Sequence, residues 1–158
     1  MVINEIHHDE DDKTLRAEFI ELYNPGDAAV DIAGWYFSNG IDYTFPAATT
    51  LGPGGYLVIA EDPDVMSSYF GVDGADGPFR NDTSLKNSGE KITLRDSSGS
   101  KIDEVDYALG FPWPTVGDEV GSPSASPSIE LINPLLDNDL GGSWRASGFP
   151  VTTAVVGG

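Results

Sequence analysis

The chain has 158 residues, with 26 Asp and Glu against eight Lys and Arg, and a formal charge of -18. Such a charge repels phosphate groups, so it argues against nucleic acid and anionic membrane surfaces as partners. The sequence contains no cysteine, which excludes disulfides, thiolate catalysis and cysteine-ligated zinc. No apolar run reaches the roughly 18 residues of a membrane span, so membrane insertion is not predicted.

Short runs rich in β-branched and aromatic residues alternate with turn signals such as NPGD, SNG, GPGG and DSSG, a pattern typical of an all-β fold. Strands are predicted at residues 2–6, 17–24, 34–39, 41–45, 55–61, 90–96, 101–107 and 128–133. This spacing indicates an antiparallel sandwich or barrel, with a hairpin loop near Ser98 and Gly99.

One short helix is predicted after residue 61. Asp62 is placed as its N-terminal cap, Pro63 at its first position and Gly71 as its end. We expect Trp35 to be the central core anchor, flanked by six aliphatic residues, Ile20, Leu22, Leu57, Ile59, Ile92 and Leu94. Burial of each is worth on the order of 2 kcal/mol.

The domain organisation predicted from the sequence is one domain over residues 1–150. Within it, residues 121–128 (GSPSASPS) form a flexible loop before the closing strand, and Trp144 packs back on the sandwich. Residues 151–158 are predicted to be a frayed tail. With only Met1 ahead of the strand-like VINEI, the chain is interpreted as a module of a longer protein.

Glu18 and Glu21, in the segment EFIEL, are the first carboxylates to consider as a catalytic pair. Alternation along a strand places Glu18 with Ile20 and Leu22 on the core face, and Glu21 on a half-covered outer face with Phe19 and Tyr23. Catalytic carboxylates of a glycosidase must converge on one bond, within about 5 to 10 Å of each other. The two glutamates point apart, so the sequence predicts no such pair.

The order of the blocks VINEI, EFIELYNPGDAAVDIAGWYFSNG, YTFPAATTLGPGGYLVIAED and SLKNSGEKITLRDSSGSKIDEVDY resembles a bacterial lamin tail domain. The resemblance covers residues 2–107, and SPSIELINP with SWRAS resembles the closing segment of the bacterial versions. It implies an immunoglobulin-like antiparallel β-sandwich without catalytic residues. Bacterial domains of this kind are usually appended to large secreted or surface proteins, and the animal tail domain serves protein contacts.

The chain departs from that family in its charge. The insertion HHDEDD at residues 7–12 is longer and more acidic than the family pattern, and the net charge opposes the DNA contacts attributed to lamin tails. Two histidines beside four carboxylates also raise a metal site as a hypothesis. The alternative is a charged hairpin tip without a ligand.

Two other acidic segments resemble parts of calcium loops. DGADG contains Asp73 and Asp76, and DNDLGG contains Asp137 and Asp139. Neither has the full twelve-position pattern with its terminal bidentate glutamate, and Asp or Asn beside Gly also forms ordinary turns. Calcium is therefore the cofactor that these two segments raise, and residues 7–12 raise zinc, manganese or calcium.

The segment YALGFPWPTVGD is the candidate binding site. Tyr107, Phe111 and Trp113 lie in or beside a proline-stiffened stretch, which resembles the aromatic platforms on which sugars or prolines stack. The alternative is that Trp113 only plugs one end of the sandwich. No GxSxG motif is present, and the only histidines are His7 and His8, so a catalytic triad is not predicted.

The function predicted from the sequence is a non-catalytic interaction or adhesion module of a larger secreted or cell-surface bacterial protein, binding a protein or polysaccharide. One alternative is a structural spacer or assembly domain. The other is a metal-dependent hydrolase accessory domain that uses the acidic loops.

The calcium hypothesis predicts that millimolar calcium raises the melting temperature relative to EDTA. A site filled at 100 times its dissociation constant adds about 2.7 kcal/mol, which is worth several degrees in a domain of this size. Magnesium at equal ionic strength is the control and should give no comparable rise. An unchanged melting temperature would leave these carboxylates as turn formers and surface charge.

Overall fold

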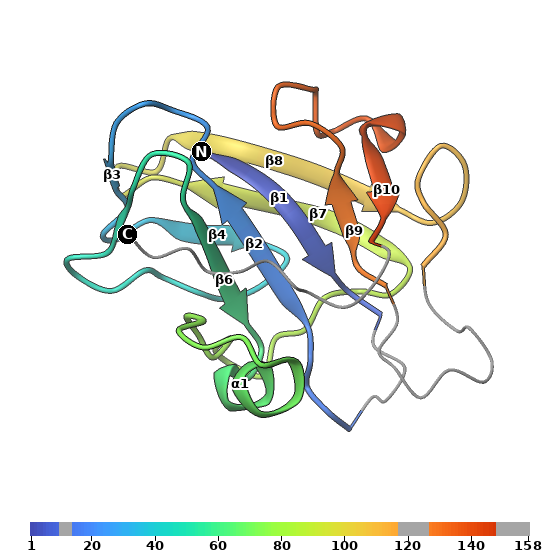
Figure 1. Ribbon diagram of the computed structural model, residues 1–158, viewed down its shortest axis with the longest axis horizontal. Helices are drawn as coiled ribbons and strands as arrows, with labels where there is room; N and C mark the ends of the chain where they lie inside the picture. The colour runs from blue at the N-terminus through green and yellow to red at the C-terminus, as the bar shows by residue number, and fades with distance from the viewer. Residues whose placement is uncertain (10–13, 117–126, 148–158) are drawn as a thin grey trace.

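The computed structural model describes residues 1–9, 14–116 and 127–147. Its strands form a five-stranded sheet in the order β10-β9-β1-β2-β6, a three-stranded sheet β4-β7-β8 and a two-stranded sheet β3-β5 (Figure 1). All strand pairs in these sheets are antiparallel. The elements are β1 Val2–His7, β2 Phe19–Tyr23, β3 Val30–Asp31, β4 Tyr36–Asn39, β5 Thr50–Leu51, β6 Tyr56–Ala60, α1 Pro63–Phe70, β7 Gly89–Arg95, β8 Lys101–Ala108, β9 Ile129–Leu131, η1 Gly141–Ser143 and β10 Trp144–Ala146.

The five-stranded and three-stranded sheets pack face to face around the main hydrophobic core. Ile20 and Ile59 from the first sheet and Ile92 and Leu94 from the second are fully buried members of one cluster. At about 2 kcal/mol for each buried side chain, this interface is the main source of stability. The prediction of an immunoglobulin-like antiparallel β-sandwich with one short helix is confirmed.

Seven of the eight predicted strands are present, with ends shifted by one or two residues. The strand predicted at residues 41–45 is wrong, because Thr44 makes only a single bridge with Tyr36. Ile41, Tyr43 and Phe45 are nevertheless all buried. Apolar and polar residues alternate in this segment because it is extended and buries every second side chain. A paired strand gives the same alternation in a sequence. The short strands β3, β5 and β10 were not predicted.

Helix α1 follows the predicted local signals. The side chain of Asp62 accepts hydrogen bonds from the backbone nitrogens of Asp64 and Val65, at 3.0 and 3.4 Å. Gly71 ends the helix in the left-handed region, with φ of 69°. These caps satisfy backbone groups that have no partner within the helix.

The outer face of β2 is covered, which corrects the half-covered face predicted for Phe19, Glu21 and Tyr23. Phe19 and Glu21 are each 1% exposed, while Tyr23 is half-buried. Phe19 forms a second apolar cluster with Met66 of α1 and with Val58, Ala60 and Val72. The covering helix lies far along the chain from β2, so alternation within the strand could not reveal it.

Trp35 is not the central anchor that the sequence predicted. It is half-buried and packs against the margin of the core. The largest fully buried side chains are instead aromatic residues such as Tyr107, Phe19 and Phe45. Trp35 lies between the turn at residues 33–34 and the first residue of β4, and its ring covers the main core from the side.

The C-terminal strands complete the five-stranded sheet from the far end of the chain. β9 pairs with β1 through Glu5 and Glu130 and through Ile6 and Ile129, and β10 pairs with β9. Figure 1 shows these orange and red strands beside the blue N-terminal strand. Trp144 is 4% exposed, which confirms that this residue packs on the sandwich. Of the flexible loop predicted at residues 121–128, residues 121–126 lie outside the described residues, as does the tail predicted at 151–158, while Ser128 is buried at 3% exposure.

Gly89 is a position at which a side chain should not fit. Its φ is +103°, and an added Cβ would lie 2.4 Å from the carbonyl oxygen of Tyr107. We expect Gly89→Ala to lower the free energy of unfolding by about 1–3 kcal/mol or more. Each kcal/mol corresponds to a loss of about 2–4 °C in melting temperature. Gly142→Ala is the matched control, because nothing lies within 4 Å of its Cβ position. Equal melting temperatures for the two variants would contradict this packing.

Candidate functional site

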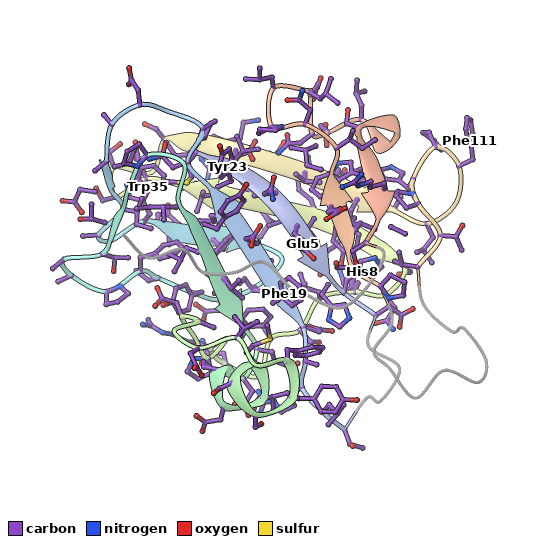
Figure 2. All side chains as sticks on the ribbon, in the orientation of Figure 1. Glu5, His8, Phe19, Tyr23, Trp35 and Phe111 are labelled. Carbon is purple, nitrogen blue, oxygen red and sulfur yellow. The ribbon has the colours of Figure 1, made fainter. Side chains whose placement is uncertain are left out.

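Large exposed hydrophobic side chains gather in two loops of the described residues. The loop after β8 and the loop between β9 and β10 together expose six of them, Leu109, Phe111, Ile132, Leu135, Leu136 and Leu140. We call these six residues the apolar end. Phe111 is fully exposed and Leu135 is 85% exposed, and Figure 2 shows Phe111 projecting from the tip of its loop. Exposure of this extent sets the apolar end apart from isolated surface leucines.

The two loops of the apolar end pack against each other. An added Cβ on Gly141 would lie 2.8 Å from the backbone nitrogen of Trp113, so only a glycine allows this approach. The rings of Trp113 and Trp144 are 6.1 Å apart between centroids. Asp139 Oδ1 accepts a hydrogen bond of 2.8 Å from the backbone nitrogen of Asp106 on β8. The two exposed segments are therefore parts of one end of the sandwich.

The loop between β9 and β10 is held from inside by Asn138. The indole nitrogen of Trp144 donates to the carbonyl oxygen of Asn138 at 2.7 Å. The Asn138 side chain donates to Asp103 Oδ2 at 2.7 Å and to the carbonyl oxygen of Ile3 at 3.3 Å. Because these buried groups fix the loop, its leucines are presented on a supported backbone.

The three aromatic candidates occupy different environments. Phe111 is exposed, Trp113 is half-buried, and Tyr107 is 1% exposed within the main core. The Tyr107 hydroxyl donates to the carbonyl oxygen of Lys86 at 2.7 Å, and burial raises its pKa far above the usual value. This corrects the placement of Tyr107, which lies in the core and not on the binding surface.

The aliphatic half of the apolar end was not identified from the sequence. The segment INPLLDNDL places three leucines among turn-forming residues, and that combination is the signal that could have indicated an exposed apolar loop. Its contact with the Phe111 loop depends on the tertiary structure.

The surroundings of the apolar end are acidic. Asp106, Asp137 and Asp139 are exposed, and residues 105–116 and 127–144 contain no Lys or Arg. Arg145, which directly follows the second range, is paired with Glu130 at 2.5 Å, and Lys91, opposite Asp106 on β7, is paired with Glu104 at 3.4 Å. The rim therefore carries negative charge that favours a cationic partner.

The carboxylates predicted as calcium ligands are engaged in separate local contacts. Asp73 accepts from the Ser67 hydroxyl of α1 at 2.5 Å, and Asp137 accepts from the backbone nitrogen of Asp139 at 3.0 Å. Asp76 faces Tyr43, and burial raises the pKa of its carboxyl. Among the described residues, no group of three or more His, Cys, Asp and Glu residues could hold a metal ion. Calcium binding stays a prediction for the melting experiment.

His7 and His8 do not lie on a charged hairpin tip. They are 2% and 1% exposed, and His7 Nδ1 lies 2.8 Å from the carbonyl oxygen of Ala17. The ring of His7 stacks on Phe19 at 5.3 Å, and that of His8 lies 4.7 Å from Tyr107. Both histidines belong to the packed interior. Residues 10–12, the last three of the acidic insertion, lie outside the described residues.

Glu18 and Glu21 lie on opposite faces of the sheet, in agreement with the expected alternation. Glu18 Oε2 accepts from the backbone nitrogen of Leu85 at 2.6 Å, and Glu21 accepts from the Asn4 side chain at 2.9 Å. The residue opposite Glu21 is Glu5 of β1, which sequence reasoning did not consider. Only the strand register brings these two carboxylates together.

A cavity of about 440 Å³ lies at the start of α1. Its lining residues are Arg16, Glu61, Asp62, Pro63, Asp64, Pro78, Phe79 and Asp82. Arg16, its one basic lining residue, pairs with Glu61 at 3.1 Å, and Asp62 caps the helix. The cavity is therefore acidic, like the rim of the apolar end.

These features define an immunoglobulin-like β-sandwich with an exposed apolar end. A family model of the Lamin Tail Domain matches residues 1–108, and the chain belongs to this family. No curated protein matches the sequence. Strands β9 and β10 and the leucines of their connecting loop lie beyond the matched residues. No helix in the described part of the chain is long and apolar enough to cross a membrane.

Phe111 and Trp113 are predicted to differ in what their side chains support. Phe111→Ala should leave the melting temperature unchanged, because this side chain is fully exposed. Trp113→Ala should lower it by about 4–8 °C, since loss of a half-buried ring is worth about 2 kcal/mol. Thermal melts of both variants test this, and equal effects would contradict the different burial of the two rings.

Proposed function

We propose that this chain is a non-catalytic interaction module of a larger secreted or cell-surface bacterial protein, and that its apolar end binds a protein partner. The observation that carries the proposal is the gathering of six exposed hydrophobic side chains on two adjoining loops. Large exposed apolar side chains on neighbouring loops supply the apolar surface that interaction sites of soluble proteins use.

The chemistry of the apolar end favours a protein over a polysaccharide. Five of its six side chains are leucine or isoleucine, which offer no flat ring for a sugar to stack on. A protein interface combines an apolar centre with a polar rim. The carboxylates of Asp106, Asp137 and Asp139 supply such a rim, which favours a partner segment with apolar residues flanked by Lys or Arg.

The arrangement of titratable groups supports a role without catalysis. His7 and His8 are enclosed in the interior, and Glu18, directly before β2, and Glu21, within it, accept hydrogen bonds from different partners. A hydrolase needs an acid, base or metal that reaches substrate. The accessory-hydrolase alternative would require turnover that depends on added metal, and the spacer alternative would require that the apolar end bind nothing.

The test is a titration of the purified chain with an 18-residue amphipathic Leu/Lys helix, followed by calorimetry. We expect saturable binding that weakens at least tenfold, by about 1.4 kcal/mol, in the double variant Phe111→Ala, Leu135→Ala. Tyr69→Ala is the matched control, because Tyr69 is 48% exposed on α1 and outside the apolar end. Its binding should equal that of the unaltered chain.

Two further probes separate the alternatives. A Leu/Glu helix of the same length should bind more weakly, because the acidic rim repels it. If soluble cell-wall oligosaccharides bind and the Leu/Lys helix does not, the partner is a polysaccharide and not a protein. If no probe binds, the proposal fails and the spacer alternative holds.

A further inference from the structure

Three glutamates lie in one row across the outer face of the five-stranded sheet. Glu5 of β1 is paired with Glu21 of β2 on one side and with Glu130 of β9 on the other. Residues directly opposite each other in antiparallel strands have Cβ atoms about 4.5–5.5 Å apart. We call Glu130, Glu5 and Glu21 the glutamate row. Like charges so placed repel one another, so the row opposes full ionisation.

The centre of the glutamate row is enclosed. Glu5 is 4% exposed and Glu21 is 1% exposed, and Figure 2 shows Glu5 over the middle of the sheet. The pKa of Glu5 is raised from 4.5 to about 7, chiefly by burial and also by the charges of Glu21 and Glu130, while the hydrogen bond from Ser128 lowers it. A buried carboxyl between two carboxylates is the member of the row that holds a proton most readily.

Further side chains of the described residues also face the row. One is Tyr56 of β6, whose pKa is raised by burial and by the charges of Tyr23 and Glu21. Arg145 of β10 pairs with Glu130 at 2.5 Å, and the Asn4 side chain donates to Glu21 at 2.9 Å. The partner of Glu5 is an uncharged hydroxyl: Ser128 Oγ forms a hydrogen bond with Glu5 Oε1. Because the arginine lies at the far side of Glu130, its charge does not offset that of Glu5.

Ser128 connects Glu5 to the β9–β10 hairpin. Its hydroxyl lies 2.8 Å from that of Ser147, its backbone nitrogen donates to Ser147 Oγ at 3.1 Å, and Ser147 returns a backbone hydrogen bond of 2.9 Å. Ser128 directly precedes β9 and Ser147 directly follows β10. Glu5 therefore sits where both ends of the hairpin meet β1. The hairpin is joined to β1 through only two residue pairs.

We propose that the glutamate row is a pH-sensitive latch that fastens the β9–β10 hairpin to β1 when Glu5 is protonated and loosens it when Glu5 ionises. In the protonated state Glu5 donates to Ser128 Oγ, and the Ser128 hydroxyl donates to Ser147 Oγ. In the ionised state the Ser147 hydroxyl donates to Ser128 Oγ, and the Ser128 hydroxyl donates to the Glu5 carboxylate. The same two hydrogen bonds are therefore present in both states. What changes is the repulsion from Glu21 and Glu130 and the cost of burying the charge.

The latch bears on the apolar end because the hairpin carries part of it. Leu135, Leu136 and Leu140 lie in the loop between β9 and β10, and Trp144 of β10 packs on Trp113. Loosening the hairpin would separate this loop from the Phe111 loop. This consequence rests on the proposed function, whereas the latch itself depends only on the sheet.

The direction of the pH dependence follows from proton binding. Because the pKa of Glu5 is higher in the folded chain than its ordinary 4.5, the folded chain binds more protons than the unfolded chain between about pH 4.5 and 7. The contribution of Glu5 protonation to the free energy of unfolding is greatest below about pH 4.5. It falls as the pH rises to about 7 and does not change further above that pH.

The test compares melting temperatures between pH 5 and pH 8.5 for the unaltered chain, Glu5→Gln and Glu21→Gln. We expect the unaltered chain to lose about 5 °C relative to Glu5→Gln across this range, because glutamine keeps the neutral form at every pH. Glu21→Gln should reduce the loss without abolishing it, because it removes one of the two repelling charges. If Glu5→Gln does not fold, the comparison of the unaltered chain with Glu21→Gln still tests the proposal.

Glu104→Gln is the matched control, since Glu104 lies on β8 and hydrogen bonds lower its pKa. It should follow the unaltered chain across the range. A constant difference between the unaltered chain and Glu5→Gln at every pH would overturn the latch, as would a loss in Glu104→Gln equal to that in Glu21→Gln.

Hydrogen exchange then locates the loosened element. Corrected for the intrinsic rates, the amides of β9 and β10 should exchange at least fivefold faster at pH 8 than at pH 6, while those of β7 and β8 do not change. Glu5→Gln should remove the difference. A uniform change over all strands, or none in β9 and β10, would show that the row does not control the hairpin. The binding titration is a separate experiment, so either proposal can fail alone.

Discussion

The rest of the structure depends on how strand β1 is paired. It lies between β2 and β9 and shifts its register between Ile3 and Glu5. Ile3 and Ile6 are three residues apart, yet both are fully buried in the main core. In a regular strand they would point to opposite faces, so the irregularity lets one strand supply both. The same shift sets Glu5 on the outer face, opposite Glu21 and Glu130.

The β9–β10 hairpin connects the two surfaces that carry chemistry. Its inner side contributes Ile129, Leu131 and Trp144 to the main core, and its outer side contributes Glu130 to the glutamate row. Its loop carries the aliphatic part of the apolar end. Because the hairpin has only two pairs with β1, its attachment relies on side chains. An element held in this way opens more easily than the centre of the sheet, so it is where binding and proton uptake can influence each other.

The charge of -18 is used in two distinct ways. Some carboxylates build turns: Asp96 accepts from the Ser98 hydroxyl at 2.6 Å and from the backbone nitrogens of Ser98 and Ser100 at 2.8 and 2.9 Å. The hydroxyl bond, followed by the backbone bonds, lowers its pKa. Asp62 and Asp137 accept similar backbone bonds. Exposed carboxylates such as Asp106 add to a negative field. The first group explains why an Asp-rich loop need not be a metal site, and the second favours cationic partners.

The sequence by itself determined the β-rich architecture, seven strands, the capped helix and the exposed Phe111, because strand alternation, caps and turns are local properties. It did not place Tyr107 or Trp35 correctly, since strand-like alternation does not say what lies over each face. Only the tertiary structure brought the loop between β9 and β10 against the Phe111 loop, through Gly141 and Trp113, and set Glu5 between Glu21 and Glu130. Those contacts join distant parts of the chain through strand register and sheet packing, which no local pattern encodes.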